Sequence, residues 1–575
     1  MHIQADFKTL LKAAKQHTPD KNDHRLAILA DSATQHLAQA ITGYGALTNF
    51  PTQVYDADYN QIMLQVFDDS SQLYEFNPSA VLVFMCRQKL FERYCESEGN
   101  RVDFAETVMN DIKAIHRKIH QVSGASVLQF TFPYENDMAF GNFGLRAPSS
   151  FAFQLCKLNM LLMEWAAAEN YCYLADINSV KSKFAAEDFY DEKLYCNAKL
   201  AVSVNVLPQL AKSVIDVLKP LKGQQKKCVI LDLDNTLWGG VIGDDGIDNI
   251  EIGELGIGHA FSSLQLWLKE LKKRGIILCI CSKNNEGVAK EPFIKHPDMI
   301  LRFDDIAMFV ANWEDKATNI RYIQKTINIG MDSIVFLDDN PFERNLVREL
   351  VPDITVPELP ENPEQYLPYL QSLNLFETAT YSDNDAARTK QYQAEVGRTQ
   401  LQESFSDFTE YLERLEMKGK AKPFEPYYYP RIAQLTQRSN QFNLRTVRYT
   451  EADIERIAKD EHYLTLYFTL EDKFGDHGLV GVVIIEKKPD HVFVDTWLMS
   501  CRVLKRGMEE YIVNNIVRAA CEAGYETIEG EYIPTAKNAM VKDIYKQFGF
   551  EEYQENLYRL RISEYVQRDT QINDK

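Results

Sequence analysis

Two aspartates directly follow a run of apolar residues near the middle of the chain. Residues 229–231 are typical of a buried strand, and Asp232 and Asp234 come just after them. Because side chains on a strand alternate between its two sides, these carboxylates share one side. Such a pair at a strand end can hold Mg²⁺, attack phosphorus and transfer a proton. The sequence therefore predicts phosphoryl-transfer chemistry here.

Two later apolar runs also end in polar side chains that suit such a site. Ser282 follows one run, the adjacent acids Asp338 and Asp339 follow the other, and Lys316 lies between them in the sequence. Taken alone, each of these residues could equally be a helix cap or a solvated surface side chain and not part of a site. Their order and their strand context together favour a single site.

The pattern Asp-x-Asp-x-Thr, then Ser, Lys and a pair of acids, resembles the four motifs of the haloacid dehalogenase (HAD) superfamily. The resemblance implies that Asp232 is a nucleophile that forms an aspartyl-phosphate. It implies that Asp234 first protonates the leaving oxygen and then activates water. Ser282 and Lys316 would neutralise the transferring oxygens, where positioning and charge supply most of the catalysis.

The same resemblance implies a Mg²⁺ site, which suits an all-oxygen set of ligands. Asp338 would complete the metal shell with Asp232 and the backbone carbonyl of Asp234, and Asp339 would orient the metal or its waters. Glu343 either supports this shell or lies on a helix surface, and the surface is the more common place for such a residue.

The segments that carry cap domains in HAD proteins are short in this sequence. Residues 238–251 have room for a flap only, and the segment between Ser282 and Lys316 has room for one helix, one strand and loops. We therefore expect a capless HAD domain. An open site suits a large substrate, such as a phosphorylated group carried on another protein, unless a flanking domain supplies the lid.

The composition is that of a multidomain globular protein. The chain has 575 residues, with 45% hydrophobic and 25% charged residues, which predicts three or four domains. A net charge of −20 argues against a nucleic-acid binder, which needs basic patches. Ten cysteines without a Cys-x-x-Cys pair, no secretory signal and no long apolar run favour a cytoplasmic protein with no membrane span.

Alternating strand and helix patterns predict an α/β fold with three domains. We expect a doubly wound, SGNH- or flavodoxin-like sheet, a capless Rossmann-like HAD domain, a helical linker, and an α/β domain of the GNAT acyltransferase type. The predicted ranges are 1–222, 223–375, 376–419 and 420–575, and the polar stretch 219–227 is expected to link the first two domains.

The first domain resembles SGNH-type esterases in one block only. A predicted strand at 25–29 leads to Asp31-Ser32, which would place Ser32 as a nucleophile. The Asp-x-x-His that should supply the base has no match, because Leu194 stands where His is needed. A serine without a base is a poor nucleophile. The domain is therefore either an unusual hydrolase or a degenerate scaffold or carrier-binding domain.

The last domain resembles GNAT acyltransferases. Arg502, Arg506 and Gly507 match the loop that binds the phosphates of coenzyme A or phosphopantetheine, although Lys505 replaces its first glycine. Cys501 precedes this loop, where it either carries an acyl thioester or is an inert small hydrophobe.

Two further segments of this domain carry open alternatives. His477 is a possible base for Cys501. The amide- and Arg-rich stretch 431–443 either binds a phosphate or carrier, or forms a polar helix surface.

The order of the three domains, with Asp-Leu-Asp-Asn-Thr-Leu-Trp-Gly-Gly-Val in the second and Ser-Cys-Arg-Val-Leu in the third, resembles the FkbH-like family (HAD subfamily IIIC) over nearly the whole chain. The resemblance implies that 1,3-bisphosphoglycerate reacts to give an enzyme thioester. The remaining phosphate is then removed, and the glyceryl group is passed to an acyl carrier protein. The assignment of Cys501 to that thioester rests on its position. The alternatives are a plain phosphatase for sugar or other small phosphates, and an assembly protein that docks a carrier.

Overall fold

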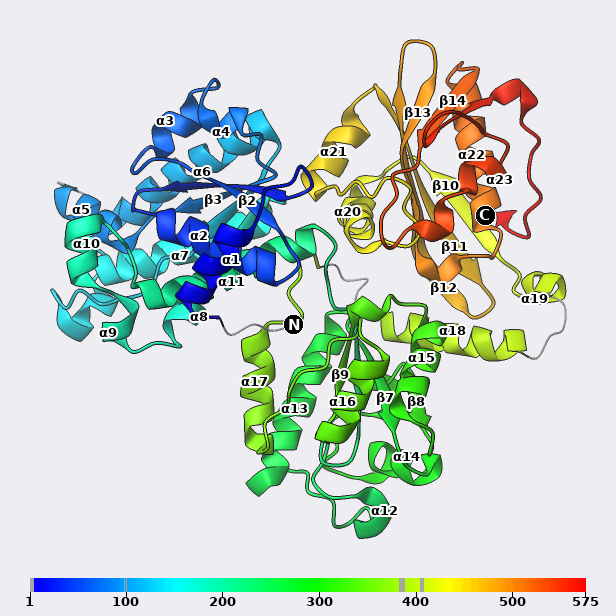
Figure 1. Ribbon diagram of the computed structural model, residues 1–575, viewed down its shortest axis with the longest axis horizontal. Helices are drawn as coiled ribbons and strands as arrows, with labels where there is room; N and C mark the ends of the chain where they lie inside the picture. The colour runs from blue at the N-terminus through cyan, green and yellow to red at the C-terminus, as the bar shows by residue number, and fades with distance from the viewer. Residues whose placement is uncertain (1–4, 98, 100, 382–387, 404–407) are drawn as a thin grey trace. The chain divides into compact units, whose positions relative to one another are not determined.

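The computed structural model describes residues 5–97, 99, 101–381, 388–403 and 408–575 (Figure 1). The chain divides into two compact units, Met1–Pro220 and Leu221–Lys575. The first unit contains one sheet and the second contains two. No helix in the described part of the chain is long and apolar enough to cross a membrane.

The first unit is built on a five-stranded parallel sheet in the order β2-β1-β3-β4-β5. Its nearly continuous apolar strands are typical of a parallel sheet covered on both faces. The predicted alternation of strands and helices is confirmed. The half-buried strand β2 escaped prediction because polar residues interrupt it. The elements are β1 (His24–Ala30), β2 (Thr52–Asp56), β3 (Ala80–Phe84), β4 (Ser126–Phe130), β5 (Cys172–Ala175), α1 (Phe7–Gln16), α2 (Gln35–Leu47), α3 (Ile62–Phe67), α4 (Gln72–Glu75), α5 (Arg87–Glu96), α6 (Phe104–Ser123), α7 (Phe151–Ala168), α8 (Ile177–Lys181), α9 (Ala186–Phe189), α10 (Glu192–Ala198) and α11 (Leu207–Leu221).

The second unit begins with a four-stranded parallel sheet in the order β8-β7-β6-β9. The two central strands are fully buried, and helix α13 packs on the sheet through Phe261, Leu264 and Leu268. The elements are β6 (Cys228–Leu231), β7 (Ile277–Ser282), β8 (Met308–Ala311), β9 (Ile334–Leu337), α12 (Ile242–Asp245), α13 (Gly256–Lys273), α14 (Glu286–Lys295), α15 (Lys316–Ile327), α16 (Pro341–Leu350) and α17 (Tyr366–Leu373).

The segments where a cap would be inserted hold small elements only. Residues 239–255 contain the short helix α12 and one isolated bridge between Gly239 and Glu251, and residues 283–315 contain α14, a short 3-10 turn and β8. The expected lack of a cap domain is therefore confirmed for these described segments.

The rest of the second unit forms an eight-stranded mixed sheet in the order β15-β16-β14-β13-β12-β11-β10-β17. Strands β13 and β14 pair in parallel and are joined by helix α22, whereas the long strands β11, β12 and β13 pair antiparallel. The elements are β10 (Lys418–Lys422), β11 (Tyr463–Asp472), β12 (Gly475–Lys487), β13 (Val492–Met499), β14 (Thr527–Glu531), β15 (Glu551–Gln554), β16 (Leu557–Arg561), β17 (Asn573–Asp574), α18 (Arg388–Glu403), α19 (Phe408–Arg414), α20 (Tyr429–Arg438), α21 (Glu451–Lys459), α22 (Met508–Glu522) and α23 (Ile544–Gln547).

Two predicted boundaries differ from the elements observed. The polar stretch expected to be a linker from residue 219 begins inside helix α11, which continues to Leu221. The expected border between residues 419 and 420 falls inside β10, which pairs with β11 and so belongs to the last sheet. Both errors arise because the packing of an end residue, which depends on distant partners, decides where an element stops.

A tight turn after β6 positions the paired aspartates. The backbone N–H groups of Thr236 and Leu237 both donate to the carbonyl of Leu233. Asn235 adopts a left-handed backbone with φ of 53°, and its side-chain oxygen accepts a hydrogen bond from Gly240 N at 3.0 Å. Asparagine tolerates this conformation better than other residues with a Cβ atom.

Replacing Asn235 tests whether this turn is strained. Asn235→Val should lower the free energy of unfolding by about 1–2 kcal/mol, because a β-branched side chain clashes with the backbone at positive φ. Asn235→Gly is the matched control, since it loses the same side-chain bond but accepts the backbone angle. Urea unfolding of the two variants should separate them, and equal losses would show that the hydrogen bond matters and the angle does not.

Candidate functional site

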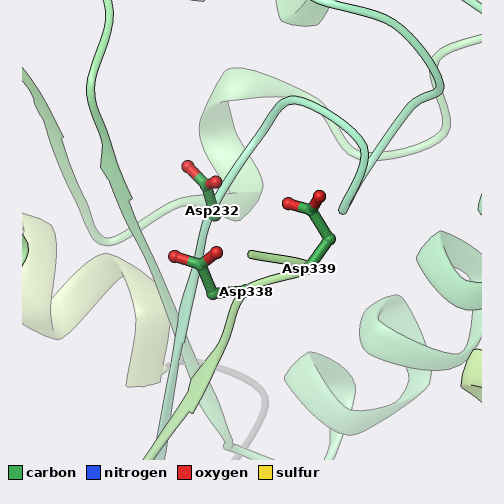
Figure 2. Close-up of side chains that lie close together, drawn as sticks. All are labelled: Asp232, Asp338 and Asp339. Atoms are coloured by element: carbon green, nitrogen blue, oxygen red, sulfur yellow. The ribbon is translucent and has the colours of Figure 1, made fainter. Parts of the chain in front are cut away.

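Three carboxylates meet at one edge of the four-stranded sheet. Asp232 follows β6, and Asp338 and Asp339 follow the neighbouring strand β9. One oxygen from each of the three lies within 4.8 Å of the others, and Figure 2 shows the side chains gathered at the ends of the two strands. Ligands of open parallel sheets bind at this carboxyl edge.

Lys316 lies between two of these acids. Its Nζ is 2.8 Å from Asp232 Oδ2 and 2.6 Å from Asp338 Oδ2, and the side chain is buried. Burial alone would lower the pKa of Lys316, but the two carboxylates raise it above its ordinary value. The lysine begins α15, where Asp315 caps the helix, so a local cap and a long-range ion pair together set its position.

The three carboxylates themselves are poorly solvated. Burial, and then the charge of Asp232, raise the pKa of Asp338 to about 6 against the opposing effect of Lys316. The same two causes raise the pKa of Asp339. Oδ1 of Asp232 is buried and has no hydrogen-bond partner among the described residues. A buried oxygen without a donor, beside two further carboxylates, suits a hard divalent cation such as Mg²⁺.

Asp234 is held apart from this cluster by three donors. Its carboxylate accepts hydrogen bonds from Trp238 Nε1 at 3.0 Å, Ile242 N at 3.0 Å and Asn284 Nδ2 at 2.7 Å. The side chain is therefore oriented by the turn and by the end of β7. Its predicted contribution to the metal, which involves the backbone carbonyl, stays a prediction.

Asn284 also connects the predicted phosphoryl-binding serine to the site. Its Nδ2 lies 3.5 Å from Ser282 Oγ, and both side chains are buried. The structure thus brings together all six predicted residues of this site at the carboxyl edge. The role of Asn284 escaped prediction because an asparagine after a strand is common at any helix start, and Asn285, its neighbour, does cap α14.

The expectation that Glu343 lies on a helix surface is wrong. The residue is buried, at 7% exposure, and Oε1 lies 2.6 Å from Lys283 Nζ. This pair ties the start of α16 to the end of β7. A residue one turn into an amphipathic helix faces the core or solvent according to packing that the local sequence does not reveal.

Arg344 braces the backbone that carries the two acids after β9. Its Nη1 donates to the carbonyls of Asp338 at 2.9 Å and Asp339 at 2.6 Å, and Nη2 lies 2.5 Å from Glu358. The side chain is buried, at 3% exposure. A planar guanidinium can serve these acceptors together, whereas an ammonium group cannot match that geometry.

Arg344→Lys should therefore lower the free energy of unfolding by about 2 kcal/mol, because charged hydrogen bonds to buried carbonyls are lost. Arg348→Lys is the matched control: Arg348 also binds Glu358 but is partly exposed, so its loss should stay below about 0.5 kcal/mol. Denaturant unfolding measures both. Equal effects would contradict a bracing role for Arg344.

The predicted phosphate-binding loop of the last sheet is largely engaged in internal contacts. Arg502 is buried, with Nε 3.3 Å from Ser500 Oγ and its guanidinium over the ring of Tyr392. Arg506 is also buried and lies 3.9 Å from Asp472. Gly507 adopts a φ of 80° and caps α22.

Lys505, which stands where the loop's first glycine is expected, has a left-handed backbone. Its φ is 61°, a conformation for which glycine is usual. Its N–H donates to Glu509 Oε1 at 2.9 Å. Binding of a phosphate by the loop stays a prediction.

His477 is held by another acid. Its Nε2 lies 2.9 Å from Asp472 Oδ2, and Arg398 binds the same carboxylate with two bonds of 2.7 Å. Burial lowers the pKa of His477. Because Asp472 occupies Nε2, that nitrogen is not placed to act as a base for Cys501.

Cys501 lies on the wall of a cavity of about 310 Å³ within the second unit. The side chain is partly exposed. Arg431, Arg438 and Phe442 from the predicted amide- and Arg-rich stretch line the same cavity, as do Lys227 and the loop 329–333 from the four-stranded sheet. The structure thus joins two segments that the sequence could present only separately.

In the first unit, Ser32 lacks the partners of an active serine. Its Oγ is buried, with no hydrogen-bond partner among the described residues. Burial raises the pKa of the adjacent Asp31 to about 6. Asp191, which stands in the segment where an acid and a histidine are expected, caps helix α10. A hydrolase site at Ser32 stays a prediction without a base.

A family model and a solved structure both match the N-terminal part of the chain. Residues 25–219 match the model of the FkbH N-terminal domain. A crystal structure described as the N-terminal part of protein BF1531 from Bacteroides fragilis, containing a phosphatase domain and complexed with Mg, is 45% identical, with a TM-score of 0.62. The match covers 66% of this chain and 100% of that one.

Solved acetyltransferases match at a much lower level. Ribosomal-protein-S18-alanine N-acetyltransferase from Escherichia coli is 16% identical, covering 26% of this chain and 98% of its own, with a TM-score of 0.21. The spermidine/spermine N-acetyltransferase SpeG from Vibrio cholerae is 12% identical, covering 26% and 96%, with the same TM-score. No curated protein sequence matches. The identity to the Bacteroides fragilis protein over its whole resolved length, together with the matched N-terminal domain, shows that this chain belongs to the FkbH-like family.

Proposed function

We propose that the carboxyl edge of the four-stranded sheet is the active site of a Mg²⁺-dependent phosphatase that acts through an aspartyl-phosphate. The observation that carries this proposal is the group of Asp232, Asp338 and Asp339 around buried Lys316, with no donor to Asp232 Oδ1 among the described residues. The related Bacteroides fragilis structure, which contains a phosphatase domain and Mg, supports it.

The residues divide the reaction between them. An oxygen of Asp232 attacks phosphorus, a new O–P bond forms, and the bond from phosphorus to the ester oxygen breaks. Asp234 protonates that leaving oxygen and then takes a proton from the water that hydrolyses the aspartyl-phosphate. Trp238 and Asn284 orient its carboxylate through the bonds described above.

Lys316 and Ser282 stabilise the transferring group. The ammonium of Lys316 lies 2.8 Å from Asp232 Oδ2, and the buried hydroxyl of Ser282, at the end of β7, lies 3.5 Å from Asn284 Nδ2. Bound Mg²⁺ would neutralise phosphoryl charge, and Asp232, Asp338 and Asp339 would hold it. Because no cap covers these segments, we expect the site to accept a phosphate presented on a large or tethered molecule.

Asp232→Asn should reduce phosphate release from a general phosphomonoester by a factor on the order of 10³ or more, because an amide cannot form the acyl-phosphate. Chelation of Mg²⁺ should silence the parent protein as well. Asp244→Asn, in the exposed helix α12, is the control and should retain parental activity. Full activity of the Asp232 variant in a phosphate-release assay would refute the covalent mechanism.

We further propose that this phosphatase is coupled to transfer of a glyceryl-type acyl group to an acyl carrier protein. In that reaction the Cys501 sulfur attacks the acyl carbon of an acyl phosphate, the C–O bond to phosphate breaks, and a thioester remains. The carrier's thiol then takes the acyl group and frees Cys501. The partly exposed thiol beside cationic side chains supports this assignment, since such surroundings favour a thiolate nucleophile.

The alternative is a phosphatase for sugar or other small phosphates, with the flanking domains serving as architecture. Mass spectrometry of protein incubated with 1,3-bisphosphoglycerate and a carrier separates the two. Coupling predicts a phosphoglyceryl or glyceryl adduct on Cys501 that disappears in Cys501→Ser and persists in Cys521→Ser, an exposed control. Absence of any adduct on Cys501 or the carrier would leave the plain phosphatase.

A further inference from the structure

Four polar side chains of the first unit come together beyond the carboxyl ends of its parallel strands. Arg87, Glu135 and Lys181 lie three, five and six residues after the neighbouring strands β3, β4 and β5, and Tyr190 follows α9. We call these four residues the Arg87 cluster. Ligands of open parallel sheets bind at this edge. The phosphatase chemistry proposed for the second unit makes no use of these residues.

Three polar atoms of the Arg87 cluster are buried and have no hydrogen-bond partner among the described residues. They are Arg87 Nε, Glu135 Oε2 and Tyr190 Oη. Glu135 Oε2 lies 3.6 Å from Arg87 Nε and 3.7 Å from Lys181 Nζ, and both distances are too long for a good hydrogen bond. Buried polar groups are nearly always bonded to protein, water or a ligand. Three such atoms in one cluster therefore indicate a place where a bound molecule supplies the partners.

Helix α8 holds two members of the cluster in position. Nζ of Lys181 donates to the carbonyl of Tyr134 at 2.8 Å and lies 5.2 Å from the centre of the Tyr190 ring. Asn178 of the same helix accepts a hydrogen bond from Tyr134 N at 2.7 Å, so α8 also fixes the backbone that carries Glu135. Burial lowers the pKa of Lys181, and the charge of Glu135 opposes this. A poorly solvated cation gains when an anion enters, because the anion replaces lost hydration.

The unpaired atoms indicate what kind of molecule would fit. Arg87 Nε and the Tyr190 hydroxyl can donate and need acceptors, whereas Glu135 Oε2 accepts and needs a donor. A ligand that serves all three carries an acid group and a hydroxyl group close together. The two cations and one acid give the cluster a net charge of +1. One negative charge balances it, which favours a carboxylate over a phosphate monoester, whose charge approaches −2 at neutral pH.

From this arrangement we propose that the Arg87 cluster binds a small hydroxy-carboxylate. The carboxylate of the ligand accepts hydrogen bonds from Arg87 and Tyr190, with the ammonium of Lys181 nearby, and its hydroxyl donates to Glu135. A planar guanidinium matches a carboxylate well, because it can donate two parallel bonds. The inference goes beyond the proposed function and does not depend on it, since no residue of the phosphatase or acyl-transfer proposal takes part.

Protection of Arg87 from phenylglyoxal, which modifies guanidinium groups, tests the site. The full-length protein is treated in EDTA, which excludes metal-dependent binding of acids, and each arginine is followed by peptide mass spectrometry. Glycolate is the probe, and acetate, which lacks only the hydroxyl, is its matched control. At ten times the glycolate dissociation constant, modification of Arg87 should slow about tenfold, since about one molecule in eleven is unliganded. The exposed Arg146 should react unchanged.

The comparison of the two acids tests the contact with Glu135. Acetate should need a concentration at least about tenfold higher for the same protection, because it leaves Glu135 Oε2 without a donor. In Glu135→Ala protein the two acids should protect Arg87 equally. Glu187→Ala, which removes an exposed acid of α9, is the control and should keep the preference for glycolate. Equal protection by both acids in the parent protein would overturn the assignment of a hydroxy-carboxylate.

Removal of the Tyr190 hydroxyl supplies a second readout. Tyr190→Phe should weaken glycolate binding about three- to tenfold in a ligand-observed NMR titration, because one donor to the carboxylate is lost. Tyr134→Phe, at an exposed ring of the same edge, should leave the affinity unchanged. Protection of Arg87 by chloride equal to that by glycolate, or none by glycolate, would overturn the proposal. Either result leaves the phosphatase proposal, tested by Asp232→Asn in Mg²⁺, unaffected.

Discussion

The placement of one lysine between two carboxylates determines the rest of the phosphoryl site. Lys316 contacts Asp232 and Asp338 across two strands and a helix, and all three side chains are buried. Taking three charges out of water is costly unless geometry and hydrogen bonds are favourable. The surroundings supply that geometry: Arg344 fixes the backbone of the acids after β9, Asp315 caps the helix that begins at Lys316, and a left-handed turn at Asn235 sets the segment after β6.

The same strand that positions this site also separates it from the cavity beside Cys501. Lys227, which lines that cavity, directly precedes strand β6, and Asp232 of the carboxylate cluster directly follows it. A parallel sheet gives every strand the same direction, so its two edges are chemically distinct and cannot share a small bound molecule. Under the proposed function, thioester formation at one edge and phosphate removal at the other would therefore need a carrier that moves between them. This requirement agrees with the absence of a cap in the described segments around the carboxylates.

Helix α18, which lies between the two sheets in the sequence, makes contacts with both of them. Tyr392 packs in the core of the four-stranded sheet, and Arg398 binds Asp472 in the last sheet with two bonds. The prediction of a linker for this region describes its place in the sequence but not its packing. The buried Arg398–Asp472–His477 group also explains why His477, the predicted base for Cys501, serves structure: its ring contacts the carboxylate that pairs with Arg398.

The sequence by itself determined the α/β class, the order of the domains and the identity of the residues at the carboxylate site. Those features are local: apolar runs mark buried strands, and polar residues that end parallel strands must meet at one edge. Only the tertiary structure decided which long-range partners complete the site. Glu343 could be surface or core until α16 was packed, Asn284 gained its role by facing Asp234, and Lys227 joined Cys501 in one cavity only when the two sheets of the second unit came together. Burial and contacts between residues far apart in the chain depend on packing, which no local pattern encodes.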